Sequence, residues 1–237
     1  MNPILAGVIA AGAGVGAGLA LRGEVIRLSV RPGEPDRAAC DHCAAALPGR
    51  PALWCGHCGS WIGAPVAMEL TTAAVIGLLL ARFGGQPVVA AFCFLGLVAV
   101  ALTQIDVAAQ RLPDRLTLPA YPALVVLLVL AAAIDDAWGD LGRAVLGALA
   151  AIAGYLLLSV VSGGQLGGGD VKLAGLLGLI LGWLSWHALV SGVVLGFLIA
   201  ALASLLLLAF RRISRRSRVS FGPYLLSGAL LALLAVR

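Results

Sequence analysis

The sequence predicts an all-α membrane protein with about eight transmembrane helices and a small cytoplasmic zinc-knuckle-like insertion. Two features of its composition lead to this prediction: hydrophobic residues make up 61% of the 237 residues, and charged residues make up only 11%. Such a chain lies far outside the usual composition of soluble globular domains. The third observation is that apolar runs of about 17 to 25 residues, each long enough to cross the hydrocarbon core as a helix, recur along the chain.

The apolar runs divide the chain into three parts. Residues 1–21 are expected to form a first transmembrane helix rather than a removed signal peptide, because no Lys or Arg precedes Arg22. Residues 22–64 form a polar segment that contains four of the five cysteines, and residues 65–237 form a polytopic membrane domain. The expected spans are 2–21, 65–82, 87–106, 117–134, 142–162, 171–184, 187–210 and 220–236.

The distribution of basic residues predicts how these helices cross the membrane. If successive connections alternate between the two sides, thirteen of the sixteen Lys and Arg residues fall on one side. That side is cytoplasmic by the positive-inside rule, so we expect a multi-pass protein of the inner or plasma membrane with both termini outside. The same alternation places Asp106, which ends an inward-running helix, and Asp170, which begins an outward-running helix, at the cytoplasmic face.

Two C-x-x-C pairs lie in the polar segment. Cys40 and Cys43 form the first pair, and Cys55 and Cys58 form the second. Four thiolates in paired knuckles suit tetrahedral zinc, and a bound metal would supply folding energy that so short a segment cannot obtain from a large core. Residues 54–58 also match the active-site string of disulfide isomerases, but no β-α-β pattern surrounds them. Structural disulfides would need an oxidising compartment, which the predicted topology opposes.

A glycine-rich segment that ends in an acid, residues 163–172, separates two apolar runs. Backbone without internal hydrogen bonds is not tolerated in lipid, so this segment must be buried in protein or line a wet cavity. Asp170 is therefore a candidate functional residue, with a helix cap as the alternative. Lys172 could act on it electrostatically, or could be a lysine whose charged end reaches the membrane surface. The adjacent glycines would let another backbone approach closely.

Asp106 is the second candidate acid, because it has no evident structural role. Asp114, which follows Pro113 and precedes a new apolar run, is instead expected to cap a helix. If Asp106 approaches Asp170, the two carboxylates cannot both ionise comfortably and share a proton over part of the pH range. Such a pair can polarise a water with its ionised member while its protonated member hydrogen-bonds a carbonyl, as in aspartic proteases.

The motifs around these acids resemble those of the type IV prepilin leader peptidase family, which are intramembrane aspartic proteases. The resemblance rests on Ile105-Asp106, on Leu-Pro-Asp-Arg-Leu-Thr at 112–117, and on Gly-Gly-Gly-Asp-Val-Lys-Leu at 167–173. It extends to the two C-x-x-C pairs and to Glu69 in the segment 65–72. It implies that Asp106 and Asp170 are the catalytic pair, and it assigns four residues to the substrate or active-site loop: Gly167, Gly168, Gly169 and Lys172.

The same resemblance implies the substrate. This would be a prepilin or pseudopilin precursor of type IV pili or type II secretion, with a short basic leader in the cytoplasm and cleavage after a glycine at the membrane boundary. Many members also methylate the new amino terminus with S-adenosylmethionine. Glu69 would serve that activity or stabilise the cytoplasmic end of its helix. The Asn-containing stretch of the family is not evident in residues 18–30, which leaves methyl transfer open.

Two other functions fit parts of the pattern. A proton-coupled transporter would use Asp106, Asp170 and Glu69 as a relay, but it leaves the cysteine pairs unexplained. A membrane scaffold with a zinc-bound interaction module would tolerate replacement of either aspartate. Membrane lipids are expected partners in every case, and no nucleic-acid partner is expected.

Overall fold

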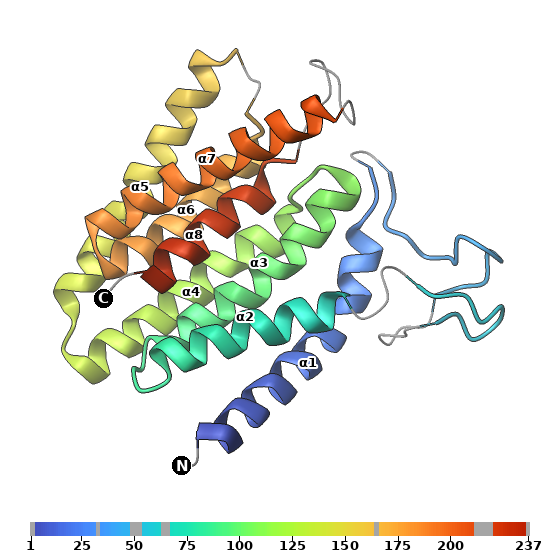
Figure 1. Ribbon diagram of the computed structural model, residues 1–237, viewed down its shortest axis with the longest axis horizontal. Helices are drawn as coiled ribbons and strands as arrows, with labels where there is room; N and C mark the ends of the chain where they lie inside the picture. Colours follow the sequence, from blue (N-terminus) through green and yellow to red (C-terminus); the bar gives the residue numbers. More distant parts are fainter. Residues whose placement is uncertain are drawn as a thin grey trace. The chain divides into compact units, whose positions relative to one another are not determined.

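The computed structural model describes residues 3–31, 34–47, 54–62, 67–163, 166–210 and 220–235. Within these ranges the regular structure is α-helical apart from two isolated β-bridges, so the predicted all-α class is confirmed. The helices follow one another in this order (Figure 1): α1 (Pro3–Leu28), α2 (Ala67–Phe83), α3 (Val89–Ala109), α4 (Asp114–Asp135), α5 (Trp138–Val161), α6 (Gly168–Leu184), α7 (Trp186–Ala209) and α8 (Gly222–Ala235). Among the described residues, four helices are long and apolar enough to cross a membrane, namely α3, α4, α5 and α7. Eight transmembrane helices therefore stay a prediction.

Several helix bounds differ from those expected. Helix α5 begins at Trp138 and not at residue 142, and α6 begins at Gly168 and not at residue 171. Helix α1 continues to Leu28, past the predicted end at residue 21. Helix α4 begins at Asp114, and its N-cap is Pro113, whose backbone is extended and makes no side-chain cap hydrogen bond. The prediction that Asp114 caps the helix is therefore wrong. Proline suits this position because its ring already holds φ near −65°.

The chain forms two compact units, Met1–Arg111 and Leu112–Arg237. In the first unit, α1 packs against α2 and α3. Glycines bring α1 and α2 together: a Cβ at Gly14 would lie 2.7 Å from the Cα of Ala73, and one at Gly18 would lie 3.1 Å from the Cα of Glu69. Small residues at this spacing allow close helix contact in membranes.

Helix α6 is the core of the second unit. Every residue from Leu173 to Trp183 is buried, because α4, α5, α7 and α8 all contact this helix. Helix α5 approaches it most closely at Gly178, where a Cβ would lie 2.7 Å from the Cα of Ala148. Helices α7 and α8 run side by side (Figure 1). An acid at the start of α6 therefore stands on the most enclosed helix of its unit.

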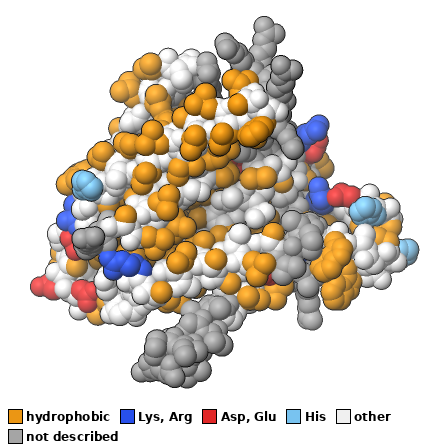
Figure 2. Space-filling model, in the orientation of Figure 1, with side chains coloured by type: hydrophobic (Ala, Val, Ile, Leu, Met, Phe, Trp, Pro, Cys, Tyr) orange, Lys and Arg blue, Asp and Glu red, His pale blue; other side chains and the backbone are white. Residues whose placement is uncertain are grey.

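Large hydrophobic side chains cover the outer faces of the helices. Leu149 and Leu157 of α5 and Leu198 and Leu205 of α7 are all exposed. Figure 2 shows hydrophobic side chains spread over the visible face, with most of the charged side chains near the left and right edges of the view. Such faces are unfavourable in water and suited to lipid, so the outer surface supports a membrane protein.

Candidate active site and cysteine cluster

The four cysteines of the polar segment lie together, as expected. Their Sγ atoms are all within 4.8 Å of one another, with Cys40 3.8 Å from Cys58 and Cys43 3.6 Å from Cys55. All four are free thiols, and these separations far exceed the roughly 2.05 Å of a disulfide. Four sulfurs at about 2.3 Å from a tetrahedral zinc ion would lie about 3.8 Å apart. The cluster could therefore hold a metal such as zinc.

The two C-x-x-C pairs adopt the same turn. The backbone N–H of Ala44 donates to the carbonyl of Cys40, and that of Gly59 donates to the carbonyl of Cys55, both at 2.9 Å. Ala44 and Gly59 have left-handed backbone, with φ of 55° and 68°. An isolated antiparallel bridge closes each turn. The repeated turn brings both cysteines of each pair to one side, as two knuckles facing one metal require.

Hydrogen bonds favour the thiolate form of two cysteines. Bonds from the backbone of His42 and Cys43 and from the Ser60 side chain lower the pKa of Cys40 to about 6. The side chain and backbone of Ser60 also lower the pKa of Cys58. Burial and the neighbouring thiols instead raise the pKa of Cys43 to about 12. Because zinc binds the thiolate and not the thiol, Cys40 and Cys58 are the ligands that these hydrogen bonds prepare, and Cys43 would have to lose its proton when the metal binds.

A buried ion pair joins α1 to α2. Arg22 Nη1 lies 2.7 Å from Glu69 Oε1, and the two side chains are only 3% and 4% exposed. Arg22 Nη2 also donates to the carbonyl oxygen of Ile62 at 2.9 Å, and Ile62 packs with Ile26 and two of the cysteines in one buried cluster. The second oxygen, Glu69 Oε2, has no hydrogen-bond partner among the described residues. Arg22 thus holds α1, α2 and the end of the cysteine segment together.

Asp106 lies in the last turn of α3 and is 5% exposed. The helix ends at Gln110, which has left-handed backbone and donates its N–H to the carbonyl of Asp106. Arg111 follows and donates from Nε and Nη2 to the carbonyl oxygen of Leu28, at 3.3 and 2.9 Å. These contacts join the end of α3 to the end of α1, so the carboxylate stands on a fixed helix end.

Asp170 lies in the first turn of α6 and is partly buried. The N-cap is Gly167, and the N–H of Asp170 donates to the Gly167 carbonyl at 3.0 Å. The alternative that Asp170 caps the helix is therefore wrong. A carboxylate within the first turn still interacts favourably with the positive end of the helix dipole.

Lys172 contacts α4 in two ways. Its Nζ lies 2.6 Å from Asp114 Oδ1. Its backbone carbonyl accepts a hydrogen bond of 2.6 Å from the Tyr121 hydroxyl. The start of α6, which bears Asp170, is thereby attached to the first half of α4.

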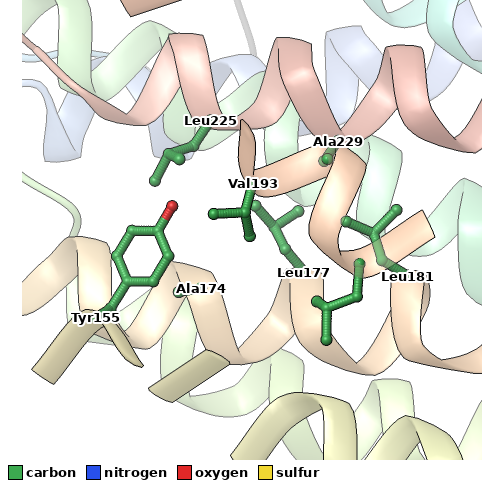
Figure 3. A pocket seen from close by; sticks show the side chains of 9 residues that line it. Tyr155, Ala174, Leu177, Leu181, Val193, Leu225 and Ala229 are labelled. Carbon is green, nitrogen blue, oxygen red and sulfur yellow. The ribbon is translucent and has the colours of Figure 1, made fainter. Parts of the chain in front are cut away.

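An apolar pocket opens beside the second turn of α6. Tyr155 of α5, Ala174 and Leu177 of α6, and Leu225 of α8 contribute to its lining. Figure 3 shows the Tyr155 ring beside Ala174, with the hydroxyl pointing toward Leu225. Tyr155 is the one polar side chain among the described lining residues, so this small apolar cavity supplies no acid for hydrolysis.

The predicted site residues are divided between the two units. Asp106, Glu69 and the four cysteines belong to the first unit, and the loop glycines, Asp170 and Lys172 belong to the second. Within the units, the structure brings the cysteines together, Glu69 to Arg22, and Lys172 to Asp114. The pairing of Asp106 with Asp170 and their catalytic roles stay predictions.

The segment that contains both aspartates matches a known protein family. The model of the type IV leader peptidase family matches residues 91–210. A prepilin leader peptidase/N-methyltransferase of Aeromonas hydrophila is 33% identical over 218 residues, which cover 84% of this chain and 71% of the relative. The chain belongs to the type IV leader peptidase family. This membership confirms the resemblance seen in the sequence.

Other members of the type IV leader peptidase family are similarly related. A prepilin leader peptidase/N-methyltransferase of Burkholderia pseudomallei is 34% identical over 215 residues, which cover 81% of this chain. The chain spans 65% of the length of that relative. No solved structure matches the chain. The family match runs from α3 to the end of α7, so it includes both aspartates, and the cysteine cluster precedes it.

Sequence reasoning missed three residues around these sites. It used Arg22 only for topology, described Asp114 as a helix cap, and did not single out Tyr121. Arg22 could have been found from the sequence, because it directly follows one apolar run and the acid Glu69 lies at the start of the next. No local signal marks Tyr121, because its partner is a backbone carbonyl 51 positions away.

Proposed function

We propose that this protein is a membrane aspartic endopeptidase that removes the cytoplasmic leader of prepilin or pseudopilin precursors after a glycine at the membrane boundary. The observation that carries the proposal is the position of Asp106 and Asp170. Each stands at the end of an apolar helix, inside the segment that matches the family. The relatives named prepilin leader peptidase/N-methyltransferase support the class of substrate.

The proposed reaction is hydrolysis of one peptide bond by an acid pair. The ionised carboxylate accepts a proton from a water molecule, and the water oxygen attacks the carbonyl carbon of the scissile bond. The protonated carboxyl group donates to the carbonyl oxygen as the tetrahedral intermediate forms. The first carboxyl group then passes the proton taken from water to the leaving nitrogen, and one hydroxyl of the intermediate returns its proton to the second carboxylate. The carbon–nitrogen bond breaks, and the acid pair is left as it began. The pair shares one proton throughout because two adjacent carboxylates resist double ionisation.

The two helix ends favour different roles for the acids. Asp170 stands at the amino-terminal end of α6, where the helix dipole stabilises negative charge, whereas Asp106 stands in the last turn of α3 and is buried. We therefore assign Asp170 as the base that receives the proton from water. Asp106 is assigned as the acid that donates to the carbonyl oxygen.

The proposed cofactors differ in how well the described residues fit them. The Cys40, Cys43, Cys55 and Cys58 cluster fits a zinc ion, which would bind there as a structural ion and stabilise the polar segment. S-adenosylmethionine would be required for N-methylation. Glu69, the residue considered for that activity, is buried against Arg22 and offers almost no accessible surface to a cofactor. We derive no step through S-adenosylmethionine, and methylation of the mature amino terminus is an additional activity to be tested.

The proposed membrane arrangement follows from the charge distribution. Family membership and the four helices that are long and apolar enough to cross a membrane support an inner-membrane protein. In our proposal all eight helices cross the bilayer, both termini lie outside, and the acids face the cytoplasm. A precursor with its hydrophobic segment in the bilayer would then reach the acids sideways from the lipid.

Cleavage of a pilin precursor by purified protein in lipid tests the proposal. Asp106→Asn and Asp170→Asn keep the size of each side chain and remove its ionisation, so each variant is expected to lose at least about 10³-fold in kcat. The matched control is Asp136→Asn. Asp136 is exposed at the end of α4 and has left-handed backbone, which asparagine also adopts readily. The Asp136→Asn variant should therefore cleave the precursor at the wild-type rate.

The outcome separates the endopeptidase from the proton-coupled transporter. Full cleavage by either folded Asn variant of the acid pair would refute the assignment of the dyad. A wild-type protein that cleaves no precursor but carries protons across vesicles, with loss of transport in the same variants, would support the transporter. Mass spectrometry of the new amino terminus, with and without S-adenosylmethionine, reports methylation in the same reaction.

A further inference from the structure

Three contacts hold the first two turns of α6 against the start of α4. Lys172 Nζ lies 2.6 Å from Asp114 Oδ1, and the Tyr121 hydroxyl donates to the Lys172 carbonyl at 2.6 Å. Leu112 lies so close to α6 that a Cβ on Gly169 would be 2.9 Å from the Cβ of Leu112. An ion pair, a hydrogen bond to the backbone and an apolar contact thus act on the same short stretch.

A glycine of α6 makes the hydrogen bond from α4 possible. A Cβ at Gly175 would overlap the Tyr121 hydroxyl oxygen and force it to move. The absence of a side chain at Gly175 therefore lets Tyr121 reach the carbonyl of Lys172. A carbonyl oxygen has two lone pairs, so it can accept this bond in addition to one within the helix.

Asp170 lies between the contacts along α6. It follows Gly169 directly and precedes Lys172 by two positions. Residues two positions apart on a helix do not face each other, and the Lys172 side chain pairs with Asp114. The contacts therefore hold the backbone on both sides of Asp170.

The ion pair is too exposed to contribute much to global stability. The side chains of Lys172 and Asp114 are 39% and 57% exposed, and water screens such pairs effectively. Its main effect is to restrain where the first turn of α6 lies. Catalysis depends strongly on such restraints, since a displacement of about 1 Å in a catalytic group can lower the rate about 100-fold.

We propose that Lys172, Asp114 and Tyr121 are positioning residues that hold Asp170 in place through α4. The kinetic part of this inference rests on the proposed endopeptidase function. Its structural part, that the three residues restrain the start of α6, does not depend on that function.

The test compares single charge removals with an exchanged pair, in protein reconstituted in lipid nanodiscs. Lys172→Ala and Asp114→Ala are each expected to speed amide hydrogen exchange in residues 168–176 about fivefold. They should lower kcat for precursor cleavage about 10-fold or more, with KM within about twofold of wild type. The exchanged variant Lys172→Glu/Asp114→Lys should recover both values to within about threefold. Tyr121→Phe should also speed exchange in this stretch.

The matched control is Asp140→Ala. Asp140 pairs with Arg143 at 2.8 Å, and Arg143 donates to the carbonyl of Gly182 near the other end of α6. This variant should leave exchange in residues 168–176 and precursor cleavage unchanged.

Two results would overturn the inference. Unchanged exchange at the start of α6 in both single variants would show that the pair restrains nothing. Failure of the exchanged pair to recover exchange and cleavage would show that the Lys172 charge acts in another way. If wild-type protein cleaves no precursor, the proposed function fails, and hydrogen exchange alone still decides whether these residues hold α6.

Discussion

The buried ion pair between Arg22 and Glu69 supports a quantitative prediction about stability. Both side chains are almost fully buried, at 3% and 4% exposed. Glu69→Met would remove the carboxylate that balances the Arg22 guanidinium and leave the guanidinium enclosed between α1 and α2. Removal of one member of a buried pair costs about 3 to 5 kcal/mol, because the remaining charge has lost its solvation. We expect a loss of that size in the free energy of unfolding.

The double variant Arg22→Met/Glu69→Met tests the physical reason for this loss. It removes both charges and keeps apolar side chains of similar length, and such replacements are often close to neutral. The hydrogen bond from Arg22 to the Ile62 carbonyl is lost as well, which costs about 1 kcal/mol. We therefore expect the double variant to be more stable than Glu69→Met by about 2 kcal/mol or more.

The free energies can be measured by reversible unfolding in mixed micelles, followed by circular dichroism. Arg37→Ala is the matched control, because Arg37 pairs with Asp41 at the same 2.7 Å but the side chains are 31% and 65% exposed. Its loss should be below about 1 kcal/mol. A loss below about 1 kcal/mol for Glu69→Met, or a double variant less stable than Glu69→Met, would refute the reasoning.

Two further predictions concern the metal and helix packing. Purified protein should contain about one zinc ion per chain. The Cys55→Ser variant, or treatment with a strong chelator, should lower the zinc content and make the polar segment sensitive to proteolysis. A polar segment that still resists proteolysis after the metal is removed would contradict this prediction. Gly178→Ala should destabilise the protein by about 1 to 3 kcal/mol, because its Cβ would lie 2.7 Å from the Cα of Ala148. The matched control is Gly154→Ala, because no atom lies within 4 Å of a Cβ added at Gly154. In the same unfolding assay this variant should be neutral or stabilising. Equal losses of stability in the two variants would show that α5 and α6 do not pack closely at Gly178.

The sequence correctly predicted the features that depend on residues close together along the chain. The apolar runs located all eight helices, because helix formation in a membrane depends on the composition of about 20 consecutive residues. The C-x-x-C spacing predicted the cysteine cluster, because three-residue steps set the turn that brings two sulfurs together. The helix starts were less accurate. Asp114 was described as a cap because it follows Pro113, whereas the extended backbone of Pro113 itself precedes the helix.

Family membership was also accessible from the sequence, because the motifs around Asp106 and Asp170 are short and contiguous. The contacts that support those motifs were not. Lys172 pairs with a residue 58 positions earlier, and only the packing of α4 against α6 selects Asp114 from the other acids of the chain. Tyr121 could not be identified from the sequence, because its partner is a backbone carbonyl, and every residue type has one.

The sequence by itself determined the helical class, the positions of the helices, the paired cysteine knuckles and the two candidate acids. Each of these depends on the hydropathy or spacing of residues that are close along the chain. Only the tertiary structure decided that Arg22 pairs with Glu69 and that Lys172 pairs with Asp114. These partners are 47 and 58 positions apart, so they meet only through the packing of α1 on α2 and of α4 on α6, where glycines allow the helices to approach.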